Sequence, residues 1–324
     1  MRRTIPYEML RNSTPVKLPR SPKPPRKLKA WQGVLYFAAV LILLLVFGGR
    51  LYSITDQMLP ELLIQQGFFL ISAILLVKIL RCRLRDVFPF KKPKGMAIGG
   101  VLILTLAAFL MADIYSILVM YFAPESLTDI ADRMGEILQF PSLAIELLVT
   151  ALCPAICEEA MHRGVILHSF QNSFRNKWIS VILSAAIFGI FHLYPVRMFM
   201  PAVLGVLIGI IVLETGNMFY GMLLHFCYNG FLTVISKASE GLTADIELDE
   251  LTALSAETTG LAVIMLGAMV PFLVWIGLWL VRRGTASRIP ALIPEGCARK
   301  TILQIFIPIL GIIFLGAVVI LTGR

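Results

Sequence analysis

The sequence predicts an all-α, polytopic membrane protein with about nine transmembrane helices and a cytoplasmic N-terminus. Hydrophobic residues make up 58% of the 324-residue chain and charged residues only 15%. Soluble domains contain about 45–50% apolar and about 25% charged residues, so this chain is suited to lipid. Apolar runs of the length that crosses a bilayer, about 20 residues, recur along it between short polar segments.

The apolar runs are expected to be helical because backbone groups in lipid must form their hydrogen bonds within the protein. They are too long and too uniformly apolar for the alternating strands of a membrane barrel. The nine predicted spans are residues 31–51, 59–80, 96–122, 143–168, 178–194, 199–215, 218–236, 259–281 and 302–322.

Basic residues collect in alternate loops, which sets the predicted orientation. They are Arg81, Arg83, Arg85, Lys91, Lys92 and Lys94, then Arg175 and Lys177, then Arg282, Arg283, Arg288, Arg299 and Lys300. Acidic residues mark the loops between: Glu125, Asp129, Asp132 and Glu136, then Glu240, Asp245, Glu247, Asp249, Glu250 and Glu257. By the positive-inside rule the basic loops are cytoplasmic, which places a multi-pass protein in the cell membrane with its C-terminus outside.

This pattern divides the chain into five segments. They are a basic, disordered cytoplasmic tail (1–30), three N-terminal transmembrane helices (31–122), a central segment with polar motifs (140–236), an acidic external loop (237–258) and two C-terminal transmembrane helices (259–324). The net charge of +9 follows from this topology and from contact with anionic lipid. The basic residues are scattered without a nucleic-acid-binding module, so nucleic acid is not a predicted partner.

Three polar clusters lie inside predicted spans, where each ionisable group costs about 2.5–3.5 kcal/mol to insert and therefore calls for a role. The clusters are Glu158-Glu159-Ala160-Met161-His162-Arg163, Phe188-Gly189-Ile190-Phe191-His192 and His225-Phe226-Cys227-Tyr228-Asn229.

Helical geometry predicts different roles for the two glutamates. Glu159 and Arg163 are four residues apart, so they share a helix face and are expected to form an ion pair. Glu158 projects about 100° away and stays free for proton transfer. His225 and Asn229 share a face in the same way and could hold a developing oxyanion.

His192 supplies an imidazole from another helix, and Phe188, one turn earlier, could shield the pocket. Counted at 1.5 Å per residue, Glu158 and His192 lie about 18 Å and about 24 Å from the cytoplasmic ends of their helices. We therefore expect tilted helices or altered helix ends if these two residues meet.

The three clusters resemble, in order and spacing, the Glu-Glu-x-x-x-Arg, Phe-x-x-x-His and His-x-x-x-Asn motifs of the CPBP family of membrane proteases. This family includes the CAAX prenyl proteases and bacteriocin-processing enzymes, and is also called the ABI family. The resemblance makes 140–236 the expected catalytic core. It implies that Glu158 and His192 activate water, that His225 and Asn229 polarise the scissile carbonyl, and that Glu159, Arg163 and Phe188 shape the site.

His162, four residues after Glu158, has three interpretations: a metal ligand, a second proton shuttle, or an outward-facing histidine near the membrane surface. We favour the last, because a lone helical histidine is more often structural. Whether the site binds metal is left open. Glu158, His192 and His225 are acceptable zinc ligands in type, but the chain lacks the His-Glu-x-x-His motif. We slightly favour a metal-free, glutamate-dependent mechanism.

The expected partners are the lipid bilayer and a membrane protein or peptide substrate, either lipidated or membrane-associated. The sequence indicates no oligomeric state. The alternative function is a transporter or non-catalytic membrane protein that uses the same buried charges for protons or peptides. Gly205, Gly209 and Pro271 interrupt two spans as in transporters, but no paired halves emerge. A scaffold or immunity protein with a degenerate site is disfavoured, because every motif position is filled.

Overall fold

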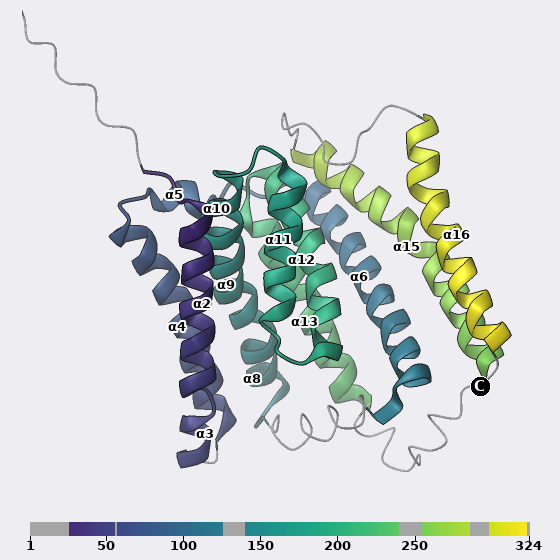
Figure 1. Cartoon of the computed structure of the whole chain (residues 1–324), viewed down its shortest axis with the longest axis horizontal. Helices are drawn as coiled ribbons and strands as arrows, with labels where there is room; N and C mark the ends of the chain where they lie inside the picture. Colours follow the sequence, from purple (N-terminus) through teal and green to yellow (C-terminus); the bar gives the residue numbers. More distant parts are fainter. Residues whose placement is uncertain (1–25, 56, 126–139, 240–254, 286–297, 323–324) are drawn as a thin grey trace, which may run out of the picture.

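The chain folds into an all-helical bundle, as predicted (Figure 1). The computed structural model describes residues 26–55, 57–125, 140–239, 255–285 and 298–322, and these contain no strand. The π-helical elements are labelled η. In chain order the elements are α2 (Ala30–Phe47), α3 (Arg50–Thr55), α4 (Met58–Ile79), α5 (Leu84–Val87), α6 (Gly95–Phe122), α8 (Leu143–Leu147), η1 (Leu148–Leu152), α9 (Cys153–Glu159), η2 (Ala160–Leu167), α10 (His168–Gln171), α11 (Lys177–Ile190), α12 (Pro195–Thr215), α13 (Met218–Ser239), α15 (Ala256–Thr285) and α16 (Ala298–Thr322).

Seven helices in the described ranges are long and apolar enough to cross a membrane: α2, α4, α6, α12, α13, α15 and α16. The chain is a multi-pass membrane protein, but the predicted number of nine spans is not exact. The predicted span 143–168 is a continuous helical segment from α8 to α10, interrupted by η1 and η2. Those two π-helical stretches were not predicted.

The predicted span 178–194 is wrong in length. Its helix, α11, starts at the Asn176 cap, whose side chain accepts a hydrogen bond of 2.9 Å from the Trp178 backbone N–H, and ends after 14 residues. Such a helix covers about 21 Å of a hydrocarbon layer about 30 Å thick. The turn that follows it stops short of the face where α6 ends (Figure 1). Because α11 ends at Ile190, His192 lies in the turn after the helix rather than in it. This is one of the altered helix ends that we expected if His192 and Glu158 are to meet.

The helix ends reach two opposite faces (Figure 1). At the top of the view lie the start of α2, the α4–α6 connection, the start of α11 and the end of α15, which carry the basic residues of the described loops. The ends of α6 and α13 lie at the bottom. Helix direction thus agrees with the alternation of charge, and the cytoplasmic assignment of the basic face stays a prediction. The tail (1–30) and the acidic loop (237–258) lie mostly outside the described residues.

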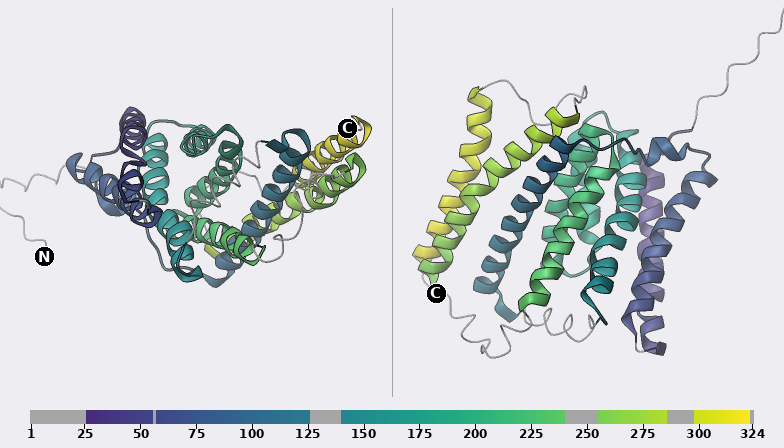
Figure 2. Two further views of the ribbon diagram at one scale, coloured as in Figure 1. Left: turned by 90° about the horizontal axis from the view of Figure 1, so that it is seen from below. Right: turned by 180° about the vertical axis from the view of Figure 1, so that it is seen from behind.

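The α9–η2 segment lies at the centre of the bundle. It packs against α2 and α4 on one side and against α11, α12 and α13 on the other (Figure 2). Beyond α13, α6 packs closely on α15. The two backbones approach so closely at Gly100 that an added Cβ atom there would lie 2.6 Å from the Gly277 carbonyl oxygen. Small residues allow such close helix contacts in membranes. All eight residues of η2 are buried, so any partners of its polar side chains come from within the protein.

Candidate active site

A buried ion-pair network joins the first and third motifs. Glu159 Oε1 lies 2.7 Å from Arg163 Nη1 and 2.9 Å from His225 Nδ1. All three side chains are buried. The predicted ion pair between Glu159 and Arg163 is therefore confirmed, and the same carboxylate also binds an imidazole from α13. This contact fixes α13 against the central helix.

Phe188 lies among the charged and aromatic groups of the site. The Arg163 guanidinium stands over the Phe188 ring at 4.5 Å, and its Nη2 atom donates to the Gly205 carbonyl at 3.3 Å. The ring centroids of His192 and His225 lie 5.2 Å and 5.7 Å from that of Phe188. Phe188 is itself buried, and its ring contacts the guanidinium of the ion pair and both histidine rings.

Glu158 has partners that differ from those of its neighbour Glu159. Its Oε1 atom accepts a hydrogen bond of 3.0 Å from Gln66 Nε2, a side chain of α4. Glu158 is half-buried, whereas Glu159 is 1% exposed. The Glu158 carboxylate is close enough to the His192 ring to interact with it electrostatically. The structure therefore brings the first and second motifs together and leaves one carboxylate outside the ion pair.

His192 is oriented by the backbone of its own motif. Its Nδ1 atom lies 2.9 Å from the Phe188 carbonyl oxygen, which can only accept. The proton is therefore on Nδ1, and in the neutral ring Nε2 is the free acceptor. This half-buried imidazole is thus held with one nitrogen available for a proton.

Asn229 lies one turn after His225 on α13 and is held from the opposite helix. Its Nδ2 atom donates to the Thr150 carbonyl at 3.0 Å. Thr150 and Thr233 exchange a hydrogen bond of 2.9 Å beside it. One amide hydrogen of Asn229 is therefore engaged by η1, and the second is the one available to a substrate.

The favoured interpretation of His162 is wrong. Its side chain is 0% exposed, and its ring packs against Phe188 and Phe191 with centroids 4.8 Å and 5.4 Å away. Neither ring nitrogen has a hydrogen-bond partner among the described residues. The outward orientation was favoured because a lone helical histidine is more often structural, but here α4 and α11 both pack on η2 and bury the ring.

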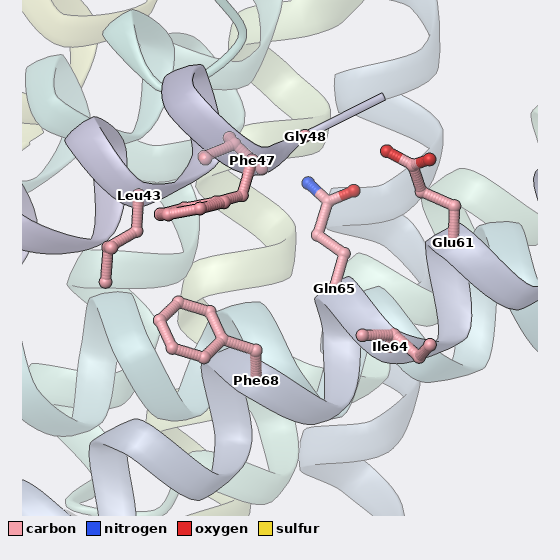
Figure 3. A pocket seen from close by; sticks show the side chains of 8 residues that line it. Leu43, Phe47, Gly48, Glu61, Ile64, Gln65 and Phe68 are labelled. Atoms are coloured by element: carbon pink, nitrogen blue, oxygen red, sulfur yellow. The ribbon is translucent and has the colours of Figure 1, made fainter. Parts of the chain in front are cut away.

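Sequence reasoning missed Gln66. A glutamine inside an apolar span is costly to bury and therefore indicates a role. Gln66 lies in the span 59–80, however, outside the predicted catalytic core of 140–236. The amide binds Glu158 from a helix outside that segment. A cavity of about 250 Å³ lies beside it, between α2 and α4, with the neighbouring Gln65 in its lining and none of the motif residues (Figure 3).

The described side chains do not form a ready-made metal site. Within residues 26–55, 57–125, 140–239, 255–285 and 298–322, no three His, Cys, Asp or Glu side chains are grouped so that they could hold one ion. His225 directs Nδ1 to Glu159, and His192 directs Nδ1 to a carbonyl. These bonds leave both Nε2 atoms free, as in histidines that bind metal. However, Glu158, His192 and His225, which are acceptable zinc ligands in type, are not grouped to hold one ion in the described structure, and we derive no step through a metal.

Comparison with known families agrees with this geometry. Residues 140–231 match the family model of the type II CAAX prenyl endopeptidases, described as Rce1-like. This match supports the resemblance to the CPBP family of CAAX proteases, and we call residues 140–231 the CPBP segment. No curated protein and no solved structure matches the chain.

The CPBP segment contains all three motifs and the helices from α8 to most of α13. The family is one of membrane proteases, which accords with a multi-pass bundle that holds polar groups at its centre. Helices α2, α4, α6, α15 and α16 lie outside the matched residues. Gln66 therefore reaches the CPBP segment from a part of the chain that the family model does not include.

Proposed function

We propose that this protein is an intramembrane endopeptidase that hydrolyses a peptide bond of a lipidated or membrane-associated protein. The observation that supports this most strongly is the division between adjacent carboxylates. Glu159 is engaged by Arg163 and His225, while Glu158 forms an ion pair or hydrogen bond with neither of them, accepts from Gln66, and lies within electrostatic range of His192 and Arg163. A structural ion pair with Arg163 needs only one glutamate, Glu159. The second carboxylate, Glu158, is near the His192 imidazole and is therefore suited to proton transfer.

In the proposed reaction, Glu158 and His192 bind a water molecule between them and remove its proton. The hydroxide oxygen forms a bond to the scissile carbonyl carbon, and the carbonyl oxygen takes the negative charge. When the C–N bond breaks, the proton held by Glu158 passes to the leaving nitrogen. The immediate products are a carboxylic acid, which keeps the second hydrogen of the water, and an amine, and Glu158 and His192 return to their starting states. In water the acid then transfers its proton to the amine, which gives a carboxylate and an ammonium group.

The oxyanion would be stabilised by donors on α13. His225 binds Glu159 through Nδ1, so Nε2 is the nitrogen that can face a substrate. For Nε2 to donate a hydrogen bond to the oxyanion while Nδ1 donates to Glu159, the His225 ring must be protonated on both nitrogens. The negative Glu159 carboxylate, which binds Nδ1, would stabilise the positive charge of that ring. Asn229 adds its remaining amide hydrogen. Glu159, Arg163 and Phe188 then act by holding these donors in place.

The proposal uses no metal in any of these steps. We expect purified protein to contain no stoichiometric zinc and to keep its cleavage rate after treatment with a chelator. Loss of cleavage on chelation, restored by added Zn²⁺, would replace the metal-free mechanism and leave the protease proposal standing.

The experiment that tests the function compares the membrane proteomes of cells that produce the wild-type protein or the Glu158→Ala variant. We expect a C-terminal or juxtamembrane peptide to be released only by the wild-type protein. Lys237→Ala, at the end of α13, controls for protein level because it lies away from the site. Identical proteomes at equal protein levels would favour the transport or binding alternative.

A further inference from the structure

We propose that Gln66 is a positioning residue for Glu158, so that α4 completes the active site that the CPBP segment begins. This inference rests on the proposed function. It concerns a side chain outside the matched residues, on a helix to which no role has been assigned.

The contact between the two residues is specific in its chemistry. Gln66 is 7% exposed, and its Nε2 atom lies 3.0 Å from Glu158 Oε1. An ionised carboxylate only accepts hydrogen bonds, so the amide must present its NH₂ group to it. The other amide atom, Oε1, is buried and has no partner in the described part of the chain. The amide is therefore held in this orientation by Glu158 rather than by a network of its own.

The neighbouring contacts of α4 support a fixed position for this amide. Phe69, three residues after Gln66, is fully buried and packs edge-on against Phe191 with ring centroids 5.2 Å apart. Phe191 directly precedes His192 in the short turn after α11. Helix α4 thus binds Glu158 directly through Gln66, and through Phe69 it packs against Phe191, the residue before His192.

A glutamine suits this position because Glu158 changes protonation during the proposed reaction. The NH₂ group donates to the carboxylate before water is deprotonated. Once Glu158 holds the proton, rotation of the amide lets the unpartnered Oε1 atom accept from the new carboxylic acid. A single side chain can therefore hold Glu158 in the same rotamer in both states, which neither an apolar residue nor a lysine could do.

The adjacent Gln65 provides a matched control. It has the same side chain but lines the cavity between α2 and α4 (Figure 3), whose lining does not include Glu158. A general need for polar groups on α4 would apply to both glutamines. A positioning role for Glu158 applies only to Gln66.

The test uses the purified full-length protein in three variants: Gln66→Met, which keeps the length of the side chain without its amide, Gln65→Met, and Glu158→Gln. The infrared carboxyl band that Glu158→Gln lacks reports directly on Glu158. We expect this band to shift in Gln66→Met and to stay in place in Gln65→Met. With the peptide found in the proteome comparison as substrate, we expect kcat of Gln66→Met to fall roughly ten- to a hundredfold at unchanged KM, as for loss of a hydrogen bond to a charged group.

An unshifted band and a wild-type kcat in Gln66→Met would overturn the inference. If Glu158→Gln is inactive in the same series, the proposed function survives that result. If Glu158→Gln cleaves at the wild-type rate, the proposed function fails, and the infrared band alone decides whether Gln66 holds the carboxylate. Should Gln66→Met not fold, Gln66→Asn replaces it: it keeps a buried amide but is one methylene too short for the bond, so the same losses are expected.

Discussion

The Nδ1 atom of His225 lies 2.9 Å from the Oε1 atom of Glu159. The same oxygen binds the Arg163 guanidinium, so one carboxylate connects two residues that are far apart in the sequence. This connection fixes the ring of a proposed oxyanion donor from behind. The other oxygen of Glu159, Oε2, is buried without a hydrogen-bond partner in the described structure, whereas the Glu158 side chain is half-buried, so the proton chemistry is assigned to Glu158.

The two glutamates are expected to respond differently to the same substitution. Glu159→Gln leaves the buried Arg163 without a charged partner, and breaking a buried pair from one side costs about 3–5 kcal/mol. Glu158→Gln removes a half-buried carboxylate that has no ion pair with Arg163. Thermal unfolding in detergent should show a large decrease in midpoint for Glu159→Gln and little change for Glu158→Gln. Equal destabilisation, with cleavage retained in Glu158→Gln, would contradict the division of roles.

His162 is expected to be replaceable by an apolar side chain. A buried polar group without a hydrogen-bond partner costs about 1–3 kcal/mol, and His162 lacks a partner for both ring nitrogens in the described structure. His162→Leu should therefore unfold at the same or a higher temperature and keep cleavage within a few-fold. His225→Leu is the control, since it removes a ring that binds Glu159 and should lose both stability and activity. Loss of cleavage in a stable His162→Leu protein would indicate the proton-shuttle interpretation instead.

Gly164 is expected to resist even a methyl group. A Cβ atom at this position of η2 would overlap the edge of the Phe88 ring. Glycine to alanine normally stabilises a helix by about 1 kcal/mol, but overpacking costs about 1–3 kcal/mol. Gly164→Ala should therefore lower the unfolding midpoint, and Phe88→Ala should remove part of that loss in the double variant.

The control for this effect is Gly99→Ala, because a Cβ atom at Gly99 of α6 meets nothing within 4 Å. It should leave the midpoint unchanged or raise it. If Gly164→Ala behaves like Gly99→Ala, the close contact between η2 and Phe88 does not limit packing.

The features that the sequence predicted well are those set by local geometry. Glu159 and Arg163 are four residues apart on one helix, so their pairing depends little on the rest of the fold. The long apolar helices follow from composition in the same way. The length of α11 is different, because Ile190, Phe191 and Leu193 continue the apolar run of the helix. Pro195, the first residue of α12, disfavours helical backbone at Tyr194, but it does not fix the end at Ile190.

The two site features that could not be predicted depend on contacts between distant segments. His162 is buried because α4 and α11 cover η2, and its spacing from Glu158 contains no information on either helix. Gln66 meets Glu158 across 92 positions of sequence. A glutamine pair on α4 indicates that the span carries polar groups, but only the tertiary structure distinguishes Gln66, at the site, from Gln65, at the cavity with α2.

The final prediction concerns the transition state. If Glu158 and His192 activate water while His225 and Asn229 hold the oxyanion, the four side chains act in one step, and the effects of removing them should not add. Loss of an oxyanion donor costs about 10²–10³ in rate, and loss of general acid–base catalysis about 10²–10⁴. Asn229→Ala should therefore retain measurable cleavage, and Glu158→Ala little or none.

The double variant Glu158→Ala/Asn229→Ala distinguishes a shared step from independent contributions. Rates of substrate cleavage in matched amounts of folded protein should be no lower for the double variant than for Glu158→Ala alone, because the oxyanion donor has nothing to stabilise once water is no longer activated. Substrate capture should persist in all three proteins, since neither residue is assigned to binding. If Glu158→Ala and His225→Ala still cleave a confirmed substrate at near the wild-type rate, hydrolysis does not occur at this site, and the buried charges serve transport or binding.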